Sequence, residues 1–185
     1  MKHPVTTMPA MLLAAMISLT APAGTAPGFV EFGKLNPPGK GAEFVEVQLR
    51  SNLINIAARL VERHEPEAAR LLRSVELVQV KVVGITDGNR EDLEKLLGQV
   101  RTELEGKNWE RNVTVQGKEG EDVAVYTKTR GSDALSGVTI TVRDARNVVL
   151  VNVVGDIKPE EVAKLGEKLN IEPLKQAGEA IKQDK

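Results

Sequence analysis

Residues 148–154 read Val-Val-Leu-Val-Asn-Val-Val, the most apolar of the segments that predict β-structure in this chain. Alternate side chains of a β-strand point to opposite faces of the sheet. The two faces of this strand should then carry Val149, Val151 and Val153 on one side and Leu150, Asn152 and Val154 on the other. The stretch predicts a central strand, around which the rest of the sheet is arranged.

Other segments with a period of two lie on both sides of this stretch. Residues 45–49 and 78–82 alternate valine or leucine with glutamate, glutamine or lysine, which is typical of half-buried strands. Further strands are expected at residues 113–116, 122–130 and 138–143. Because short turns connect the later strands, we expect antiparallel hairpins.

Four segments predict amphipathic helices. Ser51 is a candidate N-cap for the first helix, Pro66 opens the second, a turn at residues 86–89 precedes the third, and Pro159 opens the last. Gly106 is expected to end the third helix. The apolar positions that these helices would bury are Leu53, Ile56, Ala57 and Leu60; Ala69, Leu72 and Val75; Leu93, Leu96, Leu97, Val100 and Leu104; and Val162, Leu165 and Leu169.

The predicted order of elements is β-α-α-β-α-β-β-β-β-α, with most helices early and most strands late. This order favours the α+β class over a doubly wound sheet. We expect a two-layer sandwich, in which a mostly antiparallel sheet carries helices on one face. The domain is expected to span residues 43–170, between a Gly- and Pro-rich linker at 24–42 and a polar tail at 171–185. Four apolar linker residues should dock on the domain as a short hook: Phe29, Val30, Phe32 and Leu35.

The first 23 residues have the layout of a secretory signal peptide. Lys2 and His3 precede an apolar run at residues 8–19, and Ala21-Pro22-Ala23 forms a small-residue cleavage site. The run is too short to span a bilayer, which takes about 20 residues in a helix. We therefore expect a mature protein that begins near Gly24 and is periplasmic or secreted.

Charge and cysteine content restrict the partners of the mature chain. Without residues 1–23 it keeps 24 Lys and Arg against 26 Asp and Glu, a formal charge of −2, which gives no reason to expect nucleic acid as a partner. The chain has no Cys, so it has no disulfide, thiolate metal site or thiol nucleophile. It also lacks the lipidated cysteine of a lipoprotein, and we expect no membrane anchor after cleavage.

Several stretches together resemble one family. They are residues 27–33 (PGFVEFG), 43–47 (EFVEV), 77–80 (LVQV), 109–111 (WER) and 148–157 (VVLVNVVGDI). Their order is similar to that of the bacterial domain of unknown function DUF4252. The resemblance implies an exported envelope protein without an assigned activity, and suggests a link to envelope signalling because relatives occur near genes for extracytoplasmic sigma factors. Many relatives look like lipoproteins, from which this chain departs by having no Cys.

Candidate catalytic and metal-binding residues are sparse. His64 is the only histidine after residue 23, no G-x-S-x-G motif accompanies it, and it falls between two predicted helices, where capping is the expected role. The Gly-Lys-Gly of residues 33–41 does not fit a phosphate-binding loop, and residues 87–92 do not fit a calcium loop. Asp156 is a candidate general acid or base, but helix capping before Pro159 is the expected role. We predict no cofactor and no metal ion.

One face of the predicted sheet is a candidate interaction surface. If most valines face the helices, the polar strand residues face the other way and form an open face with a basic bias. Its candidate contact residues are Lys81, Tyr126, Lys128, Arg130 and Arg143. Such a face is either an ordinary solvated surface or a docking surface.

Two readings of function remain open from the sequence. The first is a non-enzymatic envelope module that binds another envelope protein, a second copy of itself or a ligand. The alternative is a hydrolase-like periplasmic enzyme with a site built from scattered carboxylates. An enzyme should present a deep pocket with convergent titratable groups, whereas a module should present a flat surface.

Overall fold

The computed structural model describes residues 26–117, 120–162 and 164. The predicted signal peptide, Leu165, Leu169 and the polar tail lie outside the described residues. The elements in chain order are β1 (Phe44–Arg50), α1 (Ser51–Val61), α2 (Pro66–Ser74), β2 (Val75–Gly84), α3 (Arg90–Gly106), β3 (Glu110–Gln116), β4 (Asp122–Arg130), β5 (Ala134–Arg143), β6 (Asn147–Ile157) and a short 3-10 helix (Pro159–Glu161).

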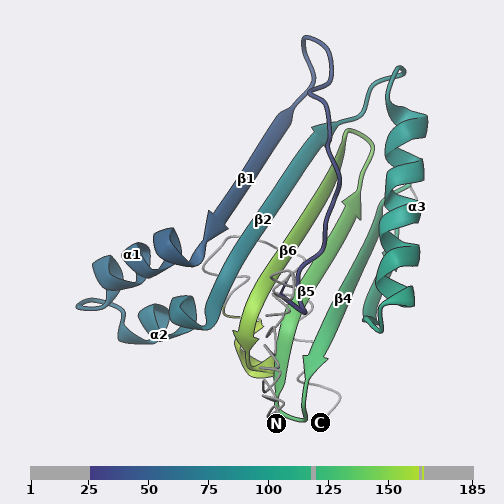
Figure 1. Ribbon diagram of the computed structural model, residues 1–185. Helices are drawn as coiled ribbons and strands as arrows, with labels where there is room; N and C mark the ends of the chain where they lie inside the picture. Colours follow the sequence, from purple (N-terminus) through teal and green to yellow (C-terminus); the bar gives the residue numbers. More distant parts are fainter. Residues whose placement is uncertain (1–25, 118–119, 163, 165–185) are drawn as a thin grey trace, which may run out of the picture.

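The six strands form one antiparallel sheet in the order β1-β2-β6-β5-β4-β3 (Figure 1). β6 lies inside this sheet, between β2 and β5, so the prediction of a central strand is confirmed. Val151 of β6 lies opposite Val80 of β2 and Ile140 of β5. The α+β class and the antiparallel sheet expected from the sequence are confirmed.

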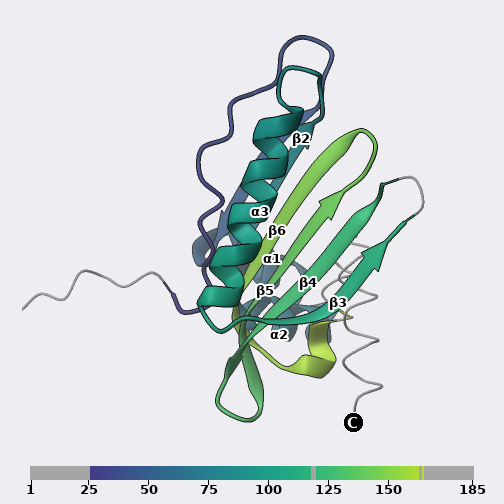
Figure 2. The ribbon, with the colours of Figure 1, turned by 90° about the vertical axis from the view of Figure 1, so that its right-hand side faces the viewer.

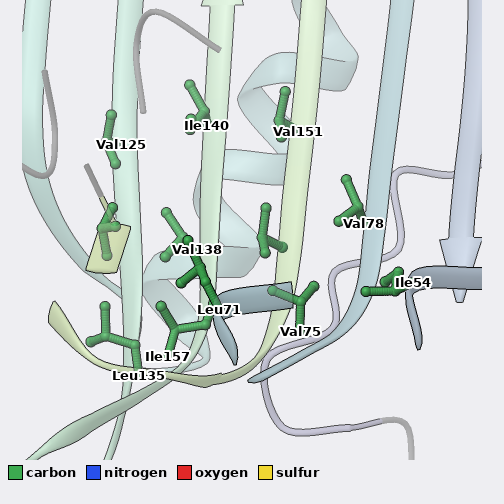
Figure 3. Packing of buried hydrophobic residues seen from close by; sticks show 12 residues of the cluster. Ile54, Leu71, Val75, Val78, Val125, Leu135, Val138, Ile140, Val151 and Ile157 are labelled. Atoms are coloured by element: carbon green, nitrogen blue, oxygen red, sulfur yellow. The ribbon is translucent and has the colours of Figure 1, made fainter. Parts of the chain in front are cut away.

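One face of the sheet is lined by branched aliphatic side chains, and we call it the valine face. Val151 and Val153 of β6 belong to it, and Val149 packs against the same cluster. The strand residues that share this buried cluster include Val78, Val125, Val138 and Ile140 (Figure 3). Ile54 of α1 and Leu71 of α2 join the cluster near one end of the sheet.

The opposite face is covered by α3 and by an N-terminal arm, residues 26–36, and we call it the arm face. Figure 2 shows the arm and α3 on the same side of the sheet. Four buried residues of α3 pack there: Leu93, Leu97, Val100 and Leu104. Val30 and Phe32 of the arm are buried in the same cluster, as the predicted hook requires, and Leu35 packs against it. The sheet thus carries helices on both faces, where the sequence predicted them on one.

α1 and α2 form a helical hairpin at the end of β1. α1 projects away from the sheet past β1, and α2 returns to β2 (Figure 1). Pro66 occupies the first turn of α2, as predicted. Ser51 is not the N-cap of α1, because the helix already includes it; Arg50 takes the N-cap position and makes no side-chain capping bond.

Candidate functional site

The face that the sequence predicted to be open is instead buried in its centre. Lys81 is 5% exposed and Tyr126 is 0% exposed. Lys128 and Arg143 are partly buried, and only Arg130 is exposed. The reason is that α3 and the arm cover the arm face, on which these residues lie. The prediction of an open docking face made of these residues is therefore corrected.

Tyr126 is a core residue under α3. The guanidinium carbon of Arg111 lies 5.8 Å from the centre of its ring, within range of a cation–π contact. Burial raises the pKa of the Tyr126 hydroxyl above its usual 10.0, against the opposing charges of Arg111 and Arg101. The hydroxyl has no hydrogen-bond partner in the described part of the chain. Tyr126 thus supplies packing, and no partner can reach it from outside.

The basic residues near Tyr126 fasten α3 and its following loop to the sheet. Arg143 Nη2 lies 2.9 Å from Glu94 Oε1 on α3. Lys128 Nζ donates to the backbone oxygen of Lys107, which follows α3. These groups therefore already have partners within the fold, which leaves Arg130 as the remaining exposed candidate of the predicted set.

The arm is held by polar side chains buried on the arm face. Lys81 Nζ donates to Gly33 O at 2.8 Å and lies 3.0 Å from Glu46 Oε1. Asn152 Nδ2 donates to Gly28 O at 3.0 Å, and Asn152 Oδ1 accepts from Val30 N–H at 3.1 Å. Buried polar groups are stable when they are hydrogen-bonded, and here the arm backbone supplies the partners. The arm is thus a built part of this face.

The exposed apolar side chains gather elsewhere, on β1 and α1. Val45, Val47 and Leu49 of β1 are each 37% exposed. Leu53, Ile56 and Leu60 of α1 are 51%, 53% and 74% exposed. Of the large hydrophobic side chains exposed in the described ranges, only Val115 lies outside this segment. We call these six residues the β1–α1 surface.

This surface corrects the predicted orientation of the first helix. The sequence assigned Leu53, Ile56, Ala57 and Leu60 to a buried stripe, but the residues of α1 that are buried are Ile54 and Ala58. The helix lies past the end of β1 and packs on α2, so the side that turns inward is about a third of a turn from the apolar stripe. The apolar stripe of an amphipathic helix usually faces the core, but in α1 most of this stripe is exposed to solvent.

The outer edge of β1 carries backbone groups without a strand beside them. Gly84 N–H donates to Glu43 O at 2.7 Å, so these two residues form a hydrogen-bonded pair that extends the β1–β2 register. Along an antiparallel strand pair, residues that bond to the neighbouring strand alternate with residues whose backbone groups point away from it, so the odd-numbered residues of β1 bond to β2. The residues whose N–H and C=O groups both point away from β2 are then Phe44, Glu46 and Gln48; Arg50 adds its N–H, because its C=O, at the N-cap of α1, accepts a bond inside that helix. In the described part of the chain β2 is the only strand beside β1.

A cavity of about 470 Å³ adjoins the end of this edge, on the arm-face side. Phe29 of the arm, Leu77 and Val154 form apolar parts of its wall, and Arg50 and Glu76 add one charge of each sign. No ion pair of Arg50 occurs among the described residues. The cavity therefore combines apolar walls with the Arg50 side chain next to the edge of β1.

The residues singled out for catalysis or metal binding do not form a site together. His64 lies in the turn between α1 and α2, where its N–H donates to Val61 O at 3.0 Å. Asp156 is exposed, and the 3-10 helix that follows it is capped instead by Glu161, whose Oε2 accepts from Lys158 N–H at 3.3 Å. Within the described ranges no three His, Cys, Asp or Glu side chains are placed to hold a metal ion. In the same ranges no helix is long and apolar enough to cross a membrane.

Comparison with known proteins identifies a family and nothing beyond it. A family model described as "Domain of unknown function (DUF4252)" matches residues 39–165. No curated protein and no solved structure matches the chain. The matched region contains the whole β1–α1 surface and begins after the arm.

Proposed function

The chain belongs to the DUF4252 family, and from this premise we propose that it is an exported, non-enzymatic binding module that docks a protein partner on the β1–α1 surface. The layout of residues 1–23 supports export to the periplasm or beyond. The proposal includes a role in envelope signalling. Identifying the protein that docks on the β1–α1 surface would test that role.

The observation that carries this proposal is the clustering of exposed apolar side chains on consecutive elements. Leu53, Ile56 and Leu60 follow helical spacing, and each leaves about half or more of its surface in water. Exposed apolar patches of this kind mark interaction sites on soluble proteins. Val45, Val47 and Leu49 continue the patch along β1.

Charged groups border the apolar residues in the manner of a protein interface. Arg73 of α2 lies 2.7 Å from Glu62 at the end of α1, and both side chains remain substantially exposed. Glu46 and Arg50 alternate with the apolar residues of β1 along the strand and point to the opposite, arm face. An apolar centre with a polar rim is the usual arrangement of a protein-binding surface.

Site-specific photo-crosslinking in living cells tests the proposal. A photoreactive amino acid at Leu60 should give a discrete adduct with a protein of the envelope fraction. The matched control is the same amino acid at Gln99, an exposed position of α3 on the other side of the sheet. The Leu60 adduct should disappear in the double variant Leu53→Gln, Ile56→Gln. Equal adduct patterns from Leu60 and Gln99, or no adduct from Leu60, would contradict the proposal.

A further inference from the structure

We propose that the partner that fits the free edge of β1 is a second copy of this chain, paired antiparallel through β1 about a two-fold axis at Gln48. This inference rests on the proposed function, because it names the partner of the β1–α1 surface. It starts from the backbone groups of that edge. Phe44, Glu46 and Gln48 point both backbone groups outward, and Arg50 points its N–H outward. An added strand would bond to Glu46, Gln48 and Arg50.

The positions of these outward groups restrict how two copies of β1 can pair. Hydrogen-bonded pairs must join outward-pointing residues of both copies, so even-numbered residues must face even-numbered residues. Three registers with a two-fold axis near the middle of β1 pair even-numbered residues with even-numbered residues. They place Glu46 opposite Glu46, Glu46 opposite Gln48, or Glu46 opposite Arg50 of the second copy.

Charge selects the third register. Glu46 opposite Glu46 juxtaposes like charges, which is unfavourable across a strand pair, and Glu46 opposite Gln48 leaves the two glutamates as diagonal neighbours. In the third register Glu46 of each copy faces Arg50 of the other copy, and Gln48 faces Gln48 at the axis. Glu46 also lies 3.0 Å from Lys81 Nζ of its own chain. Arg50 makes no ion pair among the described residues of one copy, so it is available for this contact. The same strand thus supplies both halves of two reciprocal ion pairs.

The same register matches apolar side chains on the valine face. Val47 of one copy lies opposite Leu49 of the other, twice, and all four side chains are partly exposed in the single chain. α1 projects past β1 into the space that the second sheet would enter (Figure 1). The exposed stripe of Leu53, Ile56 and Leu60 would then gain strands to pack against. Pairing through β1 therefore uses Val47 and Leu49 of the strand and brings the three exposed side chains of α1 toward the second copy.

A charge-swap experiment on the mature chain, residues 24–185, tests this pairing. Sedimentation equilibrium should show a dimer for the unmodified protein. Arg50→Glu and Glu46→Arg should each raise the dimer dissociation constant about tenfold or more, because each places like charges opposite each other twice. Mixing these two variants in equal amounts should restore a dimer, since Glu then faces Arg at both positions. Because Glu46→Arg also places a second cation beside the buried Lys81 of its own chain, circular dichroism and urea unfolding must first show that each single variant keeps its fold.

The outcomes separate this inference from the proposed function. A monomeric unmodified protein that still forms the Leu60 adduct with a different protein would overturn the pairing and leave the proposed function standing. A dimer that neither charge variant weakens would overturn the pairing, because the chains would then associate through another surface. Failure of the mixed variants to associate, with both folded, would overturn the proposed register. If the unmodified protein is a dimer but a photoreactive amino acid at Leu60 gives no adduct, that result would count against the proposed function itself.

Discussion

Asn152 Oδ1, at the middle of the central strand, accepts a hydrogen bond from Val30 N–H at 3.1 Å, although the two residues are 122 positions apart. The amide nitrogen of Asn152 donates to Gly28 O at 3.0 Å and to Thr139 Oγ1 at 3.1 Å. One buried side chain therefore joins the arm to both β6 and β5. This contact holds the arm against the arm face, away from the exposed apolar side chains of β1 and α1.

Replacing Asn152 with alanine should destabilise the fold by roughly 2–4 kcal/mol, because buried backbone groups of Gly28 and Val30 would lose their partner. Urea unfolding of the mature protein measures this change. Asn55→Ala, at an exposed position of α1, is the matched control and should change the stability by less than about 0.5 kcal/mol. Equal effects of the two substitutions would show that the arm is not held by Asn152.

Gly137→Ala should displace the arm. A Cβ atom at position 137 would lie 2.6 Å from Gly28 O and 2.8 Å from the ring of Trp109, which is too close without a backbone shift. We expect a loss of about 1–3 kcal/mol, typical of overpacking. Because Trp109 is buried and is the single tryptophan of the chain, its fluorescence should shift to the red as water reaches it.

The control for Gly137 is Gly98→Ala. Position 98 lies inside α3, and a Cβ there meets no other atom within 4 Å. Alanine in a helix interior is favoured over glycine by up to about 1 kcal/mol, so this variant should be slightly more stable with unchanged fluorescence. A red shift in both variants would argue against a specific contact between Gly137 and the arm.

Tyr126→Phe should change how stability depends on alkaline pH. Burial raises the pKa of Tyr126 above 10.0, so the native state keeps a proton that the unfolded chain releases. This contribution is fully present below pH 10 and is lost as the pH rises through the raised native pKa. The phenylalanine variant should lack that loss.

At neutral pH the same variant should be as stable as the original chain or slightly more so, because the hydroxyl has no hydrogen-bond partner among the described residues. Tyr126 is the single tyrosine of the chain, so a titration of tyrosinate absorbance reports it alone. A native titration midpoint at or below the usual value would contradict the burial of its hydroxyl.

Most strands were predictable because they keep a period of two over several residues, whereas β6 was predictable as a short apolar run, and the opposite faces assigned to Val151 and Asn152 are confirmed. Which segments of the chain pack on each face of the sheet was not predictable. Lys81 and Asn152 look solvent-facing in the sequence, but their partners are backbone atoms of a distant arm. A polar residue type does not reveal a backbone partner far along the chain. Likewise the spacing of Leu53, Ile56 and Leu60 specifies an apolar stripe, but not whether the protein itself covers it.

Export predicts a processed N-terminus. Fractionation of cells followed by N-terminal sequencing should find a protein that begins at or near Gly24, because Ala21-Pro22-Ala23 matches the small-residue pattern of a signal-peptide cleavage site. Gly28, the first arm residue bonded by Asn152, would then lie close to the new N-terminus. Finding the full-length chain in the cytoplasm would contradict the proposed location.

The central claim is that a second copy of this chain pairs with the free edge of β1. Residue-resolved amide hydrogen exchange of Gln48 tests it most directly, because its N–H points to the free edge while that of Val47 points to β2. We predict that the Gln48 amide is protected at high protein concentration and loses this protection in Arg50→Glu, while the Val47 amide stays protected in both. Rapid exchange at Gln48 at every concentration, with Val47 protected, would show an unoccupied edge and contradict the claim.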